Sequence, residues 1–240
     1  MNKIQALVKK SYKFGLVGLL ALFLLNVFYE IQNLDSNRER HLSEHYISQG
    51  VQETGAINLV TSVLYDYRAF DTLGETTVLL TAGTILAFMV PVRKARMLGT
   101  RFTTLVSQTV KWITLYVAVL GAYLISFGHL SPGGGFVGGV VLAMIPISLT
   151  ITYGVDFSEY KFKPAQKKLA EDIGVIGFIL LGLLGVWTGA NFLANGQAHF
   201  GPGETGELIS AGLIPFLNVM IGMKVGAGMA IIFSSLVKEK

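Results

Sequence analysis

Long apolar runs, separated by short polar segments, set the pattern of this chain. A membrane-spanning helix needs about 20 mostly apolar residues, within a range of roughly 17–25. No segment alternates apolar and polar residues for long enough to indicate a strand. The pattern therefore predicts an all-α integral membrane protein with about seven transmembrane helices joined by short polar loops. The seven runs cover residues 14–33, 50–66, 74–92, 112–130, 135–154, 172–193 and 208–236.

The composition agrees with a membrane protein. Hydrophobic residues make up 52% of the 240 positions and charged residues 14%, whereas about 25% of an ordinary soluble domain is charged. The net charge of +4 does not indicate nucleic-acid binding, because the Lys and Arg residues lie in a few short segments between apolar runs. That arrangement is typical of membrane topology signals. We therefore expect contact with a lipid bilayer and no nucleic-acid partner.

The chain contains no cysteine. It therefore cannot ligate an ordinary iron–sulfur cluster or a cysteine-type zinc ion, and any redox chemistry would belong to partner subunits. His41 and His45 have helical i, i+4 spacing, but no third ligand stands nearby in the sequence. We expect this chain to bind no metal and no cofactor, and to have no enzymatic activity by itself.

Basic residues divide the segments between the runs into two kinds. Segments 93–111 and 155–171 and the C-terminal tail carry Lys or Arg, whereas the turns 129–135 and 194–207 carry neither. Cytoplasmic loops of membrane proteins are enriched in Lys and Arg. The basic segments and the C-terminus are therefore predicted to lie in the cytoplasm of a prokaryotic cell, and the two turns outside it.

The N-terminal part conflicts with this rule. The first run follows four lysines and has no clear cleavage site, so we expect an uncleaved membrane anchor. Counting seven spans backward from the C-terminus places these lysines outside, against the rule. Either later loops override them, or one N-terminal run does not span. The run 50–66 is the weakest, because Asn58, Thr61 and Ser62 interrupt it.

Charged residues gather just before the third run, at Asp66, Arg68, Asp71 and Glu75. One interpretation is a solvated turn, in which Asp71 or Thr72 caps the following helix and Glu75 completes a capping box. The other is a cluster at the membrane boundary that holds coupled protons or a cation near a pathway. The two interpretations are compatible.

Lys224 is the one charge predicted at the centre of a span. It stands 14 residues before Lys238, or roughly 20 Å along a helix, which places it near the middle of the bilayer. A charge there is expensive and usually lines a polar cavity or pairs with a partner. The alternatives are a proton relay, a structural ion pair with another subunit, and a shifted helix frame that brings Lys224 nearer the membrane interface. Because no other run has a central charge, we expect the partner carboxylate to come from another chain.

A turn rich in glycine separates the fourth and fifth runs. It contains Pro132, Gly133, Gly134 and Gly135, but the Lys-Ser/Thr that would follow the glycines of a phosphate-binding loop is missing. His129 in this turn could titrate near neutral pH, although a lone loop histidine is more often merely polar.

Two pairs of glycines have the spacing of close helix–helix contacts. Gly135 with Gly139, and Gly222 with Gly226, form small-x-x-x-small faces. We therefore expect the glycine turn and the last run to serve close packing of helices or of a neighbouring chain.

Two long motifs resemble subunits of the multisubunit Na⁺/H⁺ antiporters of the Mrp, or Mnh, family. Phe127-Gly-His-Leu-Ser-Pro-Gly-Gly-Gly-Phe-Val-Gly-Gly and Ile214-Pro-Phe-Leu-Asn-Val-Met-Ile-Gly-Met-Lys-Val-Gly-Ala-Gly resemble the B subunit. The segment from Gly55 to Glu75 resembles the C-terminal end of the large A subunit, or the small E-type subunit of membrane-bound hydrogenases. The chain thus resembles a fusion, with a three-helix module at 1–92, a basic cytoplasmic linker at 93–111 and a four-helix MnhB-like module at 112–240.

The resemblance implies a membrane subunit that supports Na⁺/H⁺ translocation beside other antiporter-like subunits. It also implies coupling to a redox arm with iron–sulfur proteins, as in archaeal membrane-bound hydrogenases or sulfane sulfur reductases. A stand-alone antiporter and a purely structural spacer subunit are the alternatives. A self-sufficient carrier or quinone enzyme is disfavoured by the single intramembrane charge. Asp66, Arg68, Asp71, Glu75, His129 and Lys224 are the resulting candidates for an ion or proton pathway.

Overall fold

The computed structural model describes residues 3–33, 41–89 and 102–238. Helices and short helical turns account for most of these ranges, which contain no strand. The predicted all-α fold is therefore confirmed. The chain divides into two compact units, Met1–Leu42 and Ser43–Lys240.

The first unit contains α1 (Lys3–Asn33), a helix of 31 residues. A helix of this length extends roughly 46 Å, which exceeds the apolar thickness of a bilayer. Its stretch Lys13–Glu30 is long and apolar enough to cross a membrane. The predicted run 14–33 thus lies within one helix.

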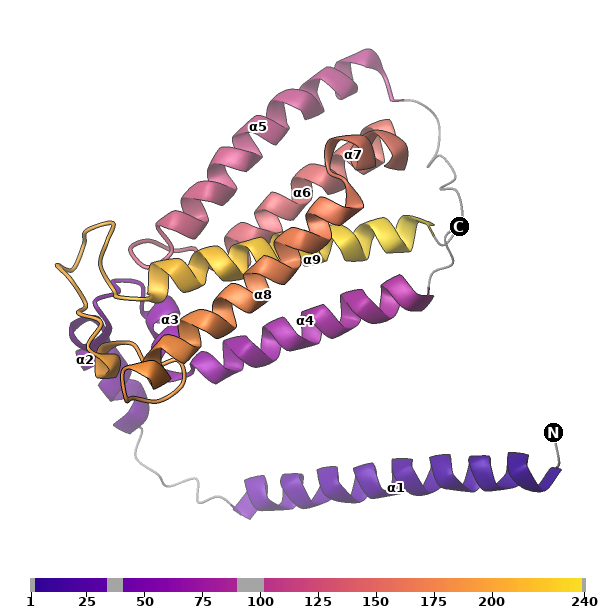
Figure 1. The fold of residues 1–240 in the computed structure, drawn as a ribbon, viewed down its shortest axis with the longest axis horizontal. Coiled ribbons are helices and arrows are strands. Elements are labelled where there is room, and N and C mark those ends of the chain that lie inside the picture. The colour runs from indigo at the N-terminus through magenta and orange to yellow at the C-terminus, as the bar shows by residue number, and fades with distance from the viewer. Residues whose placement is uncertain (1–2, 34–40, 90–101, 239–240) are drawn as a thin grey trace. The chain divides into compact units, whose positions relative to one another are not determined.

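The second unit is a helical bundle (Figure 1), and its described elements show no repeated order of helices and turns. They are α2 (His41–Thr54), α3 (Leu59–Ser62), the π-helical turn η1 (Val63–Tyr67), α4 (Ala69–Met89), α5 (Thr104–Ser126), α6 (Gly135–Tyr153), α7 (Val155–Lys161), α8 (Pro164–Trp187), the 3₁₀ turn η2 (Gly196–Ala198) and α9 (Ile214–Lys238).

Four helices of this bundle, α5, α6, α8 and α9, are long and apolar enough to span a bilayer. With α1, they give five candidate spans in the described ranges, so the predicted number of seven is not confirmed. α4 has 21 residues, or about 32 Å, and runs beside α8 and α9 in Figure 1. Its length suffices to cross a bilayer, although α4 is not among the five candidate spans.

The predicted span at 50–66 is wrong, because three local features interrupt it. α2 ends at Thr54, and Gly55 adopts a φ of +72° that side-chain-bearing residues rarely take. Asn58 then caps α3, with its side-chain oxygen accepting a hydrogen bond from the backbone N–H of Val60 at 3.1 Å. The polar residues in this run start a new helix, so the run 50–66 does not cross the membrane as a single helix.

The segment 55–62, the glycine turn and the loop between α8 and α9 meet at one end of the bundle (Figure 1). The side-chain amide of Asn58 donates to the carbonyls of Gly128 and Ser131 at 2.8 and 3.0 Å. Gly55 lies so close to Pro202 that a β-carbon there would meet the Pro202 backbone. These segments, remote in sequence, form a single cap over the helix ends.

α9 lies at the centre of the bundle and packs against α4, α6 and α8. Its buried residues Ile214, Leu217, Ile221 and Val225 recur every three or four positions, as expected of a helix face in a core. The two predicted glycine faces meet here, because a β-carbon on Gly139 of α6 would lie 2.8 Å from the backbone oxygen of Gly222. The close contact between α6 and α9 therefore depends on glycines, which have no side chain.

Candidate functional site

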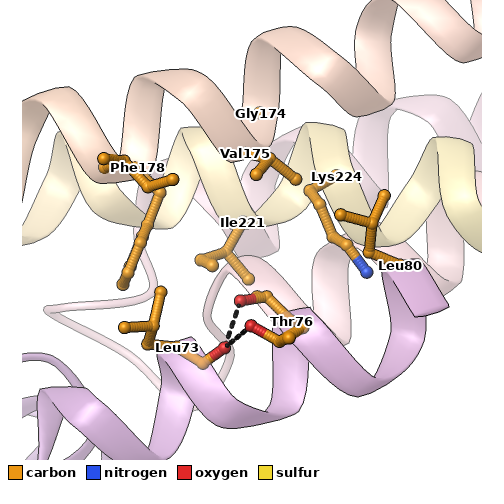
Figure 2. Close-up of a pocket in the computed structure, with 10 residues that line it drawn as sticks. Leu73, Thr76, Leu80, Gly174, Val175, Phe178, Ile221 and Lys224 are labelled. Carbon is orange, nitrogen blue, oxygen red and sulfur yellow. Dashed lines mark hydrogen bonds between the residues drawn. The ribbon is translucent and has the colours of Figure 1, made fainter.

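A small cavity lies where α4, α8 and α9 converge, with Lys224 in its wall (Figure 2). Its volume of about 50 Å³ is enough for on the order of three water molecules. Leu73, Thr76 and Leu80 of α4 form one side, and Phe178 of α8 closes it next to Ile221. The lysine is thus held in a mainly apolar enclosure.

Lys224 is completely buried, and its amino group has no hydrogen-bond partner among the described residues. In Figure 2 its side chain extends from α9 toward α4 and ends beside Leu80. Gly174 of α8 permits this packing, since a β-carbon there would lie 2.8 Å from the β-carbon of Lys224. A buried cation without a partner is costly, so the arrangement needs a nearby counter-charge.

Glu171 of α8 is a buried carboxylate that acts electrostatically on Lys224, although its ion pair is with Lys168. Its side chain is only 3% exposed. One carboxylate oxygen accepts a hydrogen bond from Lys168 at 3.1 Å, while the other, Oε1, is buried with no partner among the described residues. Oε1 lies against Gly228 of α9, where a β-carbon would approach to 2.9 Å. The carboxylate therefore sits one helical turn beyond Lys224 on α9.

A second cavity, of about 300 Å³, continues from Glu171 along the same three helices. Gly83, Thr84 and Phe88 of α4 line it together with Lys168 and Glu171. Lys168 is half exposed and also contacts Asp172, with 2.9 Å between its amino group and the Asp172 carboxylate. The charges thus run from the half-exposed Asp172 and Lys168 to the buried Glu171, and Lys224 lies one turn of α9 away from the Glu171 carboxylate.

The expected partner carboxylate from another chain stays a prediction, because Glu171 forms its ion pair with Lys168. Glu171 is nevertheless a buried charge within α8 that the hydropathy pattern misses. The apolar run begins at residue 172 by hydropathy, whereas α8 begins at Pro164. Pro at the first helical turn and a Gln166 side chain that accepts from the Lys163 backbone N–H mark this earlier start. Those signals are present in the sequence and place Glu171 two turns inside the helix.

The charged segment before α4 separates into three environments instead of one cluster. Asp66, in η1, accepts a hydrogen bond from the Asn195 side chain at 3.3 Å. Arg68 forms an ion pair with Asp71, and Glu75 is exposed on α4. Burial raises the pKa of the Asp66 carboxyl, and the Asn195 amide partly opposes that change. The structure therefore does not bring these four residues to one site.

The capping interpretation of this segment is also wrong. α4 begins at Ala69, so Asp71 and Thr72 lie inside the helix and not at its cap. The Thr72 hydroxyl donates to the carbonyl of Leu64 at 2.6 Å, across the π-helical turn. Such turns often occur at functional positions, and this one aims Tyr65 into the core beside Gly135.

The glycine turn is buried at the capped end of the bundle, away from Lys224. Asn218 of α9 accepts a hydrogen bond from the backbone N–H of Gly135 at 2.8 Å, which ties the start of α6 to α9. Gly134 has a φ of +126°, while Pro132 is exposed and Gly133 packs on Leu124. The turn holds helices together and presents no cradle for a ligand.

His129 is completely buried in this turn. Neither ring nitrogen makes a hydrogen bond of ordinary geometry to the described residues, although the backbone of Glu207 and Leu208 lies next to the ring. Burial lowers the pKa of His129, and that backbone partly opposes the change. No group of three or more metal-ligating side chains occurs within the described ranges.

The fold and this site define a class of protein. Membrane-length helices surround a central helix that carries a buried lysine beside one cavity, and a buried glutamate lines a second cavity. Ionisable groups at membrane depth face a protein interior or a polar cavity and mark charge-transfer routes. The chain is therefore a multi-pass membrane protein with ionisable groups inside its helical bundle.

Comparison with known families identifies the particular group. A family described as a domain related to the MnhB subunit of Na⁺/H⁺ antiporter matches residues 105–231. A second family, described as the E subunit of MBH, matches residues 17–99. The first match covers more than half of the chain, so the chain belongs to the MnhB-related family. This bears out the predicted resemblance.

Two curated proteins are similar in sequence. An uncharacterized protein of Methanocaldococcus jannaschii is 30% identical over 223 residues, covering 79% of this chain and 82% of that protein. A probable A/B subunit of a K⁺/H⁺ antiporter from Rhizobium meliloti is 26% identical over 129 residues, covering 43% of this chain but 13% of that much longer protein.

Two solved membrane complexes contain similar chains. A chain of the membrane-bound sulfane sulfur reductase, an archaeal respiratory membrane complex, has a TM-score of 0.71 and 28% identity, with 94% of this chain and 98% of that chain covered. A chain of the Mrp complex from Dietzia sp. has a TM-score of 0.63 and 21% identity, covering 98% of this chain and 26% of that chain, and shows a shared fold. The protein is a membrane subunit of an antiporter-like module.

Proposed function

We propose that this subunit supports Na⁺/H⁺ translocation by lining part of a charge-transfer route with Lys224 and Glu171. The observation that carries the proposal is the fully buried amino group of Lys224, without a hydrogen-bond partner in the described ranges, facing a cavity. Burying a cation and a carboxylate costs desolvation energy and contributes little to stability. The placement of Lys224 and Glu171 beside two cavities therefore favours a role in moving charge.

The row of charged groups suggests how the route works. Lys168 and Asp172 stand at its exposed end, and Glu171 follows in the second cavity. A lysine that loses its proton readily when buried can exchange it with water or with the neighbouring carboxylate. In this proposal Lys224 holds a proton at membrane depth, and Glu171 and Lys168 connect it to one surface. The chain itself catalyses no redox reaction.

Substitution of Lys224 tests the proposal. In the purified complex reconstituted in vesicles, Lys224→Ala is expected to lower Na⁺-dependent proton movement about tenfold or more while the subunits still assemble. Lys163→Ala is the matched control, because Lys163 is an exposed cation at the start of α8. Normal transport by an assembled Lys224→Ala complex would refute the route.

A purely structural spacer is the second candidate function, and the tight α6–α9 contact favours it. Gly135, Gly139, Gly222 and Gly226 all lie in this contact, where added β-carbons would meet backbone or side-chain atoms of the facing helix. A spacer predicts that Lys224→Ala leaves transport unchanged. The same vesicle experiment therefore separates the two functions.

We further propose that the parent complex couples this module to a redox arm. The support is the correspondence over nearly the whole length with one chain of the sulfane sulfur reductase complex, whereas the Mrp chain is much longer than this one. Identification of the co-purifying subunits decides the matter. Iron–sulfur proteins are expected, and two large antiporter subunits without them would indicate a stand-alone antiporter.

The corrected helix arrangement supports a cytoplasmic C-terminus. Without a span at 50–66, and with α4 counted as a span beside the five candidates, six crossings carry the chain from a cytoplasmic lysine-rich start through α1, α4, α5, α6, α8 and α9 back to the cytoplasm. The conflict with the positive-inside rule then disappears. Since the chain has no cysteine, single cysteines can report this topology. An impermeant maleimide outside intact cells should label Ile57→Cys and not Phe102→Cys, and the opposite pattern would reverse the orientation.

A further inference from the structure

α4 has two faces of different character. One face, with the buried residues Thr72, Thr76 and Gly83, packs toward α8 and α9. The other face is exposed in the second unit, and its members follow one another at helical spacing of three or four residues. They are Asp71, Glu75, Val78, Ala82 and Ile85, called here the outer face of α4.

Glu75 on this outer face lies at membrane depth. Its neighbour Thr76 lines the same cavity as Ile221, and Ile221 stands seven residues, or about 10 Å, after the start of α9. If α4 lies in the membrane beside α9, which is a candidate span, the exposed carboxylate of Glu75 faces the apolar layer and not water. A carboxylate does not remain against lipid tails but turns to a partner or a polar cavity.

This chain offers no partner for Glu75 in its described parts. Glu75 forms no hydrogen bond or ion pair with a described residue, and the nearby Arg68 is engaged by Asp71. The apolar stretch 14–29 of α1 contains no Lys, Arg or His, and it is followed by the acidic Glu30. Charge complementarity therefore requires a cation from another chain.

We propose that the outer face of α4 docks a transmembrane helix of another subunit, and that this helix presents a Lys or Arg side chain to Glu75. Gly74 beside it leaves open space, since a β-carbon there would meet nothing within 4 Å. A small residue lets a partner helix approach closely. The exposed Val78 and Ile85, further along α4 on the same face, supply apolar contact. The contact lies on the opposite face of α4 from the Lys224 cavity.

Photo-crosslinking in the purified complex tests this proposal. p-Benzoylphenylalanine at Val78, within the outer face, is compared with the same residue at Val119 on the exposed side of α5, and crosslinked peptides are sequenced by mass spectrometry. The expected product at Val78 joins an apolar, membrane-length segment of another subunit that contains Lys or Arg. Adducts with lipid only, with residues 13–33 of this chain, or with a helix lacking a cation would overturn the proposal.

Charge exchange provides a second test. Glu75→Lys is expected to abolish retention of the crosslinked subunit during purification, and replacing the identified cation by Glu should restore it. Failure of the exchange to restore retention, with both single variants assembled into the rest of the complex, would contradict the pairing. This outcome is independent of the charge route, because loss of transport in Lys224→Ala is measured in a complex that keeps all its subunits.

Discussion

The two sides of α9 differ in what fills the contact. Toward α6, the helix backbones meet at Gly135, Gly139 and Gly222, with no room for a side chain. Toward α8 and α4, the contact contains the buried ions Lys224 and Glu171 and two cavities. Helix association in a bilayer depends on close packing and on interhelical polar contacts. The contact with α6 therefore stabilises the bundle, whereas the contact with α8 and α4 contributes less stability because it buries charged groups.

The glycine-lined contact between α9 and α6 should tolerate no larger side chain. We expect the largest effect of any substitution here. Gly139→Leu places a β-carbon 2.8 Å from the Gly222 backbone oxygen, where no side chain can move aside. Overpacking of a core costs about 1–3 kcal/mol or more, and a backbone clash belongs at the upper end. The variant should yield no assembled complex on gel filtration. Val137→Leu, on the exposed side of the same helix, should assemble normally.

On the side of α9 that faces α8 and α4, a slightly larger side chain should lower transport and leave folding intact. Gly228→Ala adds a β-carbon 2.9 Å from Oε1 of Glu171, and that carboxylate can shift because it ends a flexible side chain. The gain in helix propensity, up to about 1 kcal/mol, offsets part of the strain. We expect an assembled complex with a thermal midpoint within a few degrees of the parent and a roughly threefold loss of transport in vesicles. Equal damage by Gly228→Ala and Gly139→Leu would remove the distinction between the two sides.

The same contrast explains what the sequence could predict. Hydrophobic run length predicts the helices α1, α4, α5, α6, α8 and α9, and the lone charge in the last run points to Lys224. Glycine spacing likewise indicates the close face of α9. These features are local, because each can be recognised from neighbouring residues of a single helix.

The features that escaped prediction depend on several segments at once. Glu171 stands only seven residues after Pro164 and reads as part of a basic loop, although α8 already includes it. Its relation to Lys224 arises because Gly174, Gly83 and Gly228 make room on three helices. Likewise, the run 50–66 is apolar enough to span, but Asn58 is held by the carbonyls of Gly128 and Ser131 in a distant turn.

The central claim is that Lys224 and Glu171 act as one charge-carrying unit. The most direct measurement is a double-mutant cycle of Na⁺-dependent proton movement, in vesicles with the assembled complex, using Lys224→Met, Glu171→Gln and the double variant. Residues that act as a unit are not additive in such cycles. We predict that each single variant loses about tenfold in rate and that the double variant is no slower than the worse single one. Losses that multiply to about a hundredfold, or transport that survives both substitutions, would contradict the account.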